Sequence, residues 1–182
     1  MKNPSNFFFM ALVAAGIFLA PFQCHAAYDI YLKLSGVSGE STNSAYLNQI
    51  VVLSFSSTET IPISIGLPGR ATFGDMTITK YLDVSSPTLF LDCAKGTQFV
   101  EAVLSFQDQS TKAPAFYTIK LSNVLISSVS SGGSAGGDNR PTETVTLNFA
   151  AISWTYQQLT TTGNPVGPPV IHTWDLVHLT GT

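Results

Sequence analysis

Residues 124–156, VLISSVSSGGSAGGDNRPTETVTLNFAAISWTY, contain two strand-like runs separated by a glycine-rich loop. Val145, Leu147 and Phe149 alternate with polar residues, which is the pattern of a strand with one buried face. Beyond Ala150 the large apolar side chains shift to even-numbered positions. An unbroken strand would send these side chains to the solvent face, so we expect a bulge or bend near Ala150.

The loop between the two runs, residues 130–140, has four glycines and no apolar anchor. Such a composition is typical of a surface loop. Its glycines at 132–137 are not followed by the Gly-Lys-Ser/Thr ending of a phosphate-binding loop. We therefore interpret this segment as a hairpin loop, with Pro141 opening the next strand at a position that tolerates a missing N–H.

The rest of the chain is also typical of a protein rich in β-sheet. Only 10% of the residues are charged, while Ser, Thr, Val, Ile and Phe are abundant. Many short strands with one helix predict a closed or nearly closed barrel. Strands are expected at residues 28–34, 51–55, 76–82, 99–106, 115–121, 124–129, 142–156 and 170–179, with an edge strand or extended loop at 61–67.

One helix is expected, at residues 86–95. Ser86 can cap the free N–H groups, Pro87 suits the first helical position, and Gly96 suits a left-handed C-terminal cap. One face of this helix should lie on the sheets. The side chains expected on that face are Leu89, Phe90, Cys93 and Ala94.

The N-terminus has the pattern of a signal peptide. Lys2 precedes the apolar run FFFMALVAAGIFLA at residues 7–20, which is too short to span a bilayer comfortably. Cleavage is expected between Ala26 and Ala27. An uncleaved anchor and a lipoprotein are the less favoured alternatives. The sequence thus predicts a cleaved signal peptide at 1–26, a single domain at 27–182, and a periplasmic or extracellular location.

The charge of the predicted mature chain excludes some partners. Without Lys2, the chain has seven basic and eleven acidic side chains, and no basic cluster is present. We therefore expect no nucleic-acid partner and, after signal cleavage, no membrane contact. Cys93 is the one cysteine left beyond residue 26, so no intramolecular disulfide is expected.

No residue pattern indicates catalysis or a cofactor. His172 and His178 would be roughly 20 Å apart on one strand, too far to share a metal ion. Cys93 is expected to be a buried and unreactive thiol. The carboxylates are scattered, and no nucleophile elbow is present. We expect a non-enzyme with no catalytic residue, no cofactor and no metal.

Four stretches together resemble the haemolysin-coregulated protein (Hcp) family, the tube proteins of type VI secretion. The combination of a Thr-Lys-Tyr strand, an aspartate and a Ser-Pro helix start is specific, and so is the Pro-Thr-Glu-x-Val strand. The stretches are YDIYLKLSGVSGES from Tyr28, GDMTITKYLDVSSPTLFLDCAKG from Gly74, LSNVLISSVSSGGS from Leu121 and PTETVTLNFAAISWTY from Pro141.

The resemblance implies an antiparallel β-barrel of two packed sheets with one short flanking helix. It also implies self-assembly into hexameric rings that stack into a hollow tube. Spike, sheath and effector proteins are the partners implied, with effectors carried in the lumen. The polar loop 40–48 is similar in position to the family's long loop. The resemblance therefore implies that the following residues are candidates for contacts between rings or subunits: Glu40, Ser41, Thr42, Asn43 and Ser44.

Two alternatives to a tube component stay open at this point. The first is an exported Hcp-like binding module or effector that acts outside the cytoplasm without forming a tube. Exposure of Trp154 or Trp174 in a groove would favour it. The second is a hydrolase whose carboxylate pair is assembled by the fold, which no motif supports.

Overall fold

Fourteen strands and one helix make up the described part of the computed structural model, which covers residues 28–64, 66–109, 114–136 and 140–182. The expected signal peptide at 1–26 and its cleavage point between Ala26 and Ala27 lie outside the described residues. In chain order the elements are β1 (Tyr28–Leu34), β2 (Ile50–Val52), β3 (Ser54–Ser56), β4 (Glu59–Thr60), β5 (Ile63–Ser64), β6 (Leu67–Pro68), β7 (Thr72–Phe73), β8 (Met76–Tyr81), α1 (Ser86–Lys95), β9 (Gln98–Asp108), β10 (Tyr117–Gly132), β11 (Thr142–Asn148), β12 (Ala151–Tyr156), β13 (Val170–Asp175) and β14 (Thr180–Gly181).

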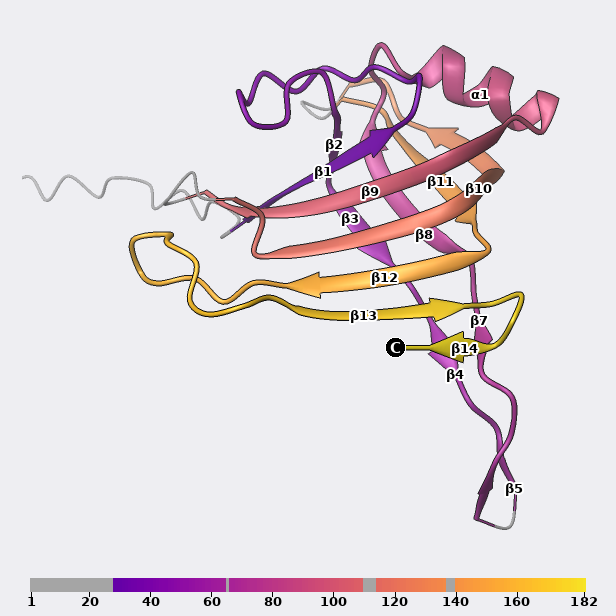
Figure 1. Cartoon of the computed structure of the whole chain (residues 1–182). Helices are drawn as coiled ribbons and strands as arrows, with labels where there is room; N and C mark the ends of the chain where they lie inside the picture. The colour runs from indigo at the N-terminus through magenta and orange to yellow at the C-terminus, as the bar shows by residue number, and fades with distance from the viewer. Residues whose placement is uncertain (1–27, 65, 110–113, 137–139) are drawn as a thin grey trace, which may run out of the picture.

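The long strand β10 organises the sheets. One edge of β10 pairs with β9, and the other pairs with β12 and then β11. From β9 the pairing continues to β1 and β2, and from β11 it continues to β8 and β3. Only Leu53 separates β2 from β3, and its N–H donates to the carbonyl of Thr79, so consecutive residues of one segment pair with β1 and then with β8. The expected mainly β architecture of two packed antiparallel sheets and one helix is confirmed (Figure 1).

The bend expected near Ala150 is confirmed. Phe149 and Ala150 separate β11 from β12, and the apolar side chains on both sides of the bend are buried, Leu147 at 0% and Ile152 at 2% exposure. The neighbouring strand β10 bends at the same level, where Asn123 has a positive φ of 52°. The bend therefore crosses adjacent strands and lets one continuous sheet contribute to both walls of the core.

The helix α1 covers one end of the barrel (Figure 1). Its bounds agree with the expected 86–95, and Gly96 adopts the expected left-handed cap at φ 63°. The expected cap residue is wrong: the N-cap is Ser85, and the Ser86 hydroxyl turns toward the interior. The expected buried face is also wrong in part, because Leu89 is buried while Phe90 is 41% exposed. Burial of Ser86 rotates the helix so that positions 86, 89 and 93 face the core.

Two further expectations about strands are wrong in detail. The strand expected at 51–55 is divided at Leu53 into β2, which pairs with β1, and β3, which pairs with β8. Ile50 and Val52 are buried, while Val51 and Leu53 are exposed. The last strand does not run through to residue 179. It ends at Asp175 and turns into the short strand β14.

The segment expected to be an edge strand or extended loop at 61–67 is the tip of a hairpin arm. Strand β4 pairs with β7, and β5 pairs with β6 further out. The arm leaves the barrel, and Figure 1 shows it projecting well beyond the other strands. Within the described residues, no helix has the length and apolar character needed to cross a membrane.

Candidate functional site

The loop that holds the expected contact residues 40–44 folds back over the outer face of β1. Tyr31 points out of the barrel, yet it is only 5% exposed because Tyr46 stacks on it with ring centroids 4.6 Å apart. Burial is the main reason that the pKa of each tyrosine is raised above its usual value. The loop is therefore packed against the barrel through a pair of aromatic rings.

Asn43 fixes the loop to two strands. Its Nδ2 donates to the Tyr31 hydroxyl at 3.1 Å and to Gln107 Oε1 at 2.6 Å. Its Oδ1 accepts from the backbone N–H of Ala45 at 3.0 Å, and its own N–H donates to Ser41 Oγ at 3.3 Å. Both ends of this amide thus have hydrogen-bond partners within the same chain, so Asn43 positions the loop.

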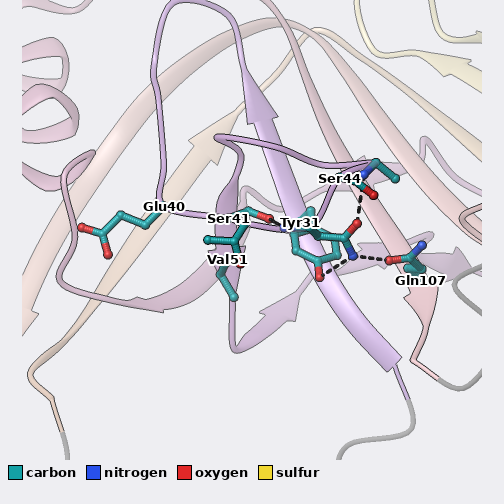
Figure 2. Close-up of a pocket in the computed structure, with 9 residues that line it drawn as sticks. Tyr31, Glu40, Ser41, Ser44, Val51 and Gln107 are labelled. Atoms are coloured by element: carbon teal, nitrogen blue, oxygen red, sulfur yellow. Dashed lines mark hydrogen bonds between the residues drawn. The ribbon is translucent and has the colours of Figure 1, made fainter.

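The loop and β1 together form an open polar depression of about 490 Å³. Of the expected contact residues, Thr42 and Ser44 are exposed at its rim, whereas Ser41 is only 4% exposed. Glu40 points away from Tyr31 and Gln107 (Figure 2). The residues lining the depression are Tyr31, Glu40, Ser41, Thr42, Asn43, Ser44, Ala45, Val51 and Gln107.

Glu40 ties the loop to the segment just before α1 and to Arg140, just before β11. Its Oε1 accepts from the N–H of Val84, just before α1, at 3.0 Å, and its Oε2 lies 3.6 Å from the Arg140 guanidinium. Arg140 in turn sits over the ring of Tyr81, 5.5 Å from its centroid. Both charged side chains are about half exposed, so this ion pair adds little stability. Glu40 is therefore also accessible to solvent.

A second constellation, which the sequence analysis did not identify, lies beneath α1. Lys80 Nζ is 2.6 Å from Glu143 Oε1 and 2.7 Å from Asp83 Oδ1, and it also donates to the carbonyl of Tyr81 at 2.8 Å. Ser86 Oγ donates to Glu143 Oε1 at 2.8 Å. We call Lys80, Asp83, Ser86 and Glu143 the buried polar cluster.

The buried polar cluster joins the two most specific sequence motifs in space. The Thr-Lys-Tyr strand supplies Lys80, and the Pro-Thr-Glu strand supplies Glu143. Both side chains are 0% exposed, which prevents a substrate from reaching them. The cluster therefore fixes α1 to β8 and β11. The sequence did contain a signal for it. Lys80 comes two residues after Ile78 and Glu143 two residues before Val145, so each charged residue lies on the buried face of its strand.

The histidines lie apart from both constellations. His178 sits in the turn after β13, where Asp175 Oδ2 is 2.9 Å from its Nδ1. This hydrogen bond and the charge of Asp175 raise the pKa of His178, and the same contact lowers the pKa of Asp175. His172 Nδ1 lies 3.0 Å from the carbonyl oxygen of Thr182.

Cys93 is half-buried against the core. Within the described ranges, no group of three or more His, Cys, Asp or Glu side chains could hold a metal ion.

The base of the arm is aromatic and its tip is apolar. Phe73 lies 6.2 Å from both Trp154 and Trp174 between ring centroids, and both indoles are partly buried. Farther out, Ile63 and Leu67 are 73% and 72% exposed. Exposed apolar side chains on a projecting hairpin are typical of a surface that contacts another protein.

Comparisons with known proteins agree with this architecture. A family model described as type VI secretion system effector, Hcp, matches residues 31–156. The protein Hcp1 of Pseudomonas aeruginosa is 36% identical over 156 residues, which cover 82% of this chain and 96% of that protein. A solved structure of a type six secretion system protein is 28% identical with a TM-score of 0.80 and covers 86% of this chain and 100% of its own. Hcp1 from Salmonella typhimurium is 26% identical with a TM-score of 0.72 and the same coverage.

Proposed function

Because this chain belongs to the Hcp family of type VI secretion proteins, we propose that it is a structural protein whose copies assemble into rings and that the rings stack into a hollow tube. Six copies per ring is the number that the family resemblance implies. The role is mechanical: the assembled walls enclose a lumen that carries effectors, with spike and sheath proteins as the outer partners.

The arm is the single observation that best supports assembly. A hairpin that leaves the barrel with Ile63 73% and Leu67 72% exposed keeps apolar area in water unless another molecule covers it. The strand β13 adds to this argument, since Val170 and Ile171 are both more than half exposed although they point to opposite faces. Contact with other copies would bury these side chains. The low charge of the surface reduces the desolvation cost of such contacts.

The loop 40–48 is our second proposed contact. Thr42 and Ser44 stand at its exposed rim, Glu40 is half exposed, and Asn43 holds the loop in a fixed shape. A rigid loop loses little conformational entropy when it binds. We therefore retain Glu40, Thr42 and Ser44 as contact residues between rings or subunits, with Ser41 and Asn43 supporting the loop from beneath.

The N-terminal segment adds export to the proposal. Lys2 followed by the apolar run at 7–20 supports removal of residues 1–26 and a periplasmic or extracellular location. N-terminal sequencing of the exported protein should begin at Ala27. Recovery of a chain that still starts at Met1 from the exported fraction would refute this part.

The assembly is tested by measuring the mass of the purified protein by light scattering, followed by negative-stain imaging of the same peak. We expect a mass of six subunits and rings with an open centre. The double variant Ile63→Asp, Leu67→Asp should assemble less, while Ile63→Val, Leu67→Ile, which keeps the apolar surface, should behave as the unaltered chain. A monomer at high protein concentration would refute the proposal.

The polar depression over β1 favours one second candidate, an exported Hcp-like binding module that acts as a monomer. The depression is open and is lined by amide, hydroxyl and carboxylate groups that could hold a polar ligand. Trp154 is packed against Phe73 and does not add to this candidate, whereas Trp174 also lines an open depression at the base of the arm, with Glu59 and Ile61, which supports it. A monomeric mass with an intact fold would make the binding module the leading hypothesis.

A further inference from the structure

An open depression of about 330 Å³ lies where the base of the arm meets β13. Its lining combines one carboxylate with aromatic rings and small or aliphatic side chains, and we call it the acidic pocket. The residues that line it are Glu59, Thr60, Ile61, Ala71, Phe73 and Trp174.

The strand pairing of the arm places the carboxylate of the acidic pocket beside an aromatic ring. Glu59 of β4 stands directly opposite Phe73 of β7, so the two side chains lie on the same face of the arm. The Phe73 ring is stacked with the Trp174 indole at an angle of 26°, with ring centroids 6.2 Å apart. Trp174 belongs to β13, so the pocket is formed by the arm and the barrel together.

The Trp174 indole is held in a fixed position. Gly181 of β14 pairs with Trp174, and a Cβ atom at Gly181 would lie only 2.7 Å from Cε3 of the indole. Glycine therefore allows the backbone of β14 to pack closely on this ring. Because the ring is already ordered, a ligand that binds against it loses little free energy to ordering the site.

Glu59 gives the acidic pocket its negative charge. The side chain is exposed, and within the part of the chain that the structure describes its carboxylate has no basic partner. Burial is the main reason that the pKa of Tyr117 on β10 is raised, and the charge of Glu59 raises this pKa further. The negative potential of Glu59 therefore extends to the barrel beneath the arm.

A carboxylate next to aromatic rings is suited to an organic cation. The carboxylate of Glu59 can accept hydrogen bonds from a cationic group, and the face of an indole attracts the same charge. Ile61 and Ala71 offer apolar contacts to the aliphatic stem that lysine and arginine carry behind their charged ends. The acidic pocket thus matches a lysine or arginine side chain, and its charge disfavours an anion.

A neighbouring depression of about 290 Å³ shares part of this wall but has the opposite charge. It is also lined by Phe73 and Trp174, but Arg70 is the charged residue in its lining. A cationic group would be repelled there. Arg70 is therefore a matched control for Glu59, since the two residues border the same pair of aromatic rings.

The open shape of the acidic pocket favours a polypeptide over a free small molecule. Sites for small molecules enclose most of the ligand, whereas Ile61 in the lining of this pocket is 48% exposed. A polypeptide can insert one side chain and add contacts around the rim. A second copy of this chain is a poor source of that side chain, because acidic residues outnumber basic ones and Lys120 and Arg140 already form ion pairs.

We propose that the acidic pocket binds a lysine or arginine side chain of a polypeptide other than a second copy of this chain. Glu59 pairs with the charge, and the rings of Phe73 and Trp174 contact the cationic group and its stem. This inference goes beyond the proposed function and does not depend on whether rings form.

Fluorescence titration of the full-length chain with Trp154→Phe tests the proposal, because Trp174 is then the only tryptophan. The probe is the tripeptide Ala-Lys-Leu with blocked ends, and the reference is the same peptide with an acetylated lysine, which has lost its charge. We expect a saturable change of fluorescence with the lysine peptide and binding of the acetylated peptide that is weaker by roughly fivefold. Calorimetry on the unaltered chain repeats the titration without Trp154→Phe.

Two variants separate the role of Glu59 from a general effect on the arm. Glu59→Gln should weaken binding of the lysine peptide by roughly fivefold and remove its dependence on salt. Arg70→Gln should bind at least as tightly as the unaltered chain. Equal affinity for the two peptides, or an equal loss in Glu59→Gln and Arg70→Gln, would overturn the inference.

The mass of the same samples, measured by light scattering, keeps this test separate from that of the proposed function. Rings that do not bind the lysine peptide would overturn the inference alone, whereas a monomer that binds it would support the inference and refute the proposed function. Peptide binding that disappears as the protein concentration rises would show that a second copy fills the acidic pocket, which would overturn our choice of partner.

Discussion

Lys80→Met should be among the most destabilising single substitutions in this protein. The Lys80 ammonium and the Glu143 carboxylate are both 0% exposed and 2.6 Å apart, so removal of one leaves the other charge buried. Glu143 would keep only the hydroxyl of Ser86, because its second oxygen, Oε2, has no hydrogen-bond partner among the described residues. The substitution would therefore leave an almost isolated carboxylate in the core.

The magnitude follows from the cost of breaking a buried ion pair, about 3–5 kcal/mol. If the free energy of unfolding falls by about 2 kcal/mol per M of urea, that loss lowers the urea midpoint of unfolding by roughly 2 M. Replacing both partners, as Lys80→Met with Glu143→Leu, should recover at least half of the loss, since a packed apolar pair needs no compensating charge. Asp83 remains satisfied by the N–H and hydroxyl of Ser85, at 2.8 and 2.5 Å.

Urea unfolding followed by the fluorescence of Trp154 and Trp174, at one fixed protein concentration, measures these differences. The matched control is Lys120→Met, because Lys120 forms an ion pair of similar length, 2.9 Å, with Glu101 but is 51% exposed. That control should cost no more than about 1 kcal/mol. The reasoning is refuted if Lys80→Met costs no more than Lys120→Met, or if the double variant is as unstable as the single one.

Two further predictions concern the turn after β13 and the loop over β1. The contact of protonated His178 with ionised Asp175 should stabilise the turn fully between pH 3.8 and 6.5, the ordinary pKa values of the two groups. This contribution should be lost as the pH falls through the lowered pKa of Asp175 or rises through the raised pKa of His178. A histidine titration by NMR would check this, and an unchanged His178 pKa in Asp175→Asn would contradict it. Gly39→Ala should destabilise the protein by about 1–3 kcal/mol, because the new methyl group would overlap the backbone of Gln49. Gly132→Ala, which meets open space, is the control for urea unfolding, and equal midpoints would disprove the overlap argument.

The candidate site could be predicted only in part from the sequence. The polar composition of residues 40–48 was enough to mark a loop, but not to separate Thr42 at the rim from Ser41 beneath it. That difference arises because Tyr31 projects outward from β1, where Tyr46 stacks on its ring and Asn43 donates a hydrogen bond to its hydroxyl. Pairs that are far apart in sequence, such as Asn43 and Gln107, leave no periodic signal in either segment.

What the sequence by itself determined is local. Alternation predicted the strands, the change of parity at Ala150 predicted the bend, and Pro87 with Gly96 predicted the two ends of α1, because each depends on backbone geometry within a few residues. The motifs also identified the family. An alternating pattern shows which side chains share one face of a strand, but not which other segment of the chain packs on that face.

The tertiary structure alone decided what covers each face. It gave β2 and β3 different partner strands on the two sides of Leu53, placed Lys80 and Glu143 together in the core and sent the arm away from the barrel. Each of these outcomes depends on contacts between segments separated by many residues. A buried charge becomes tolerable only when its partner arrives from another strand, so the identity of that partner is a property of the fold.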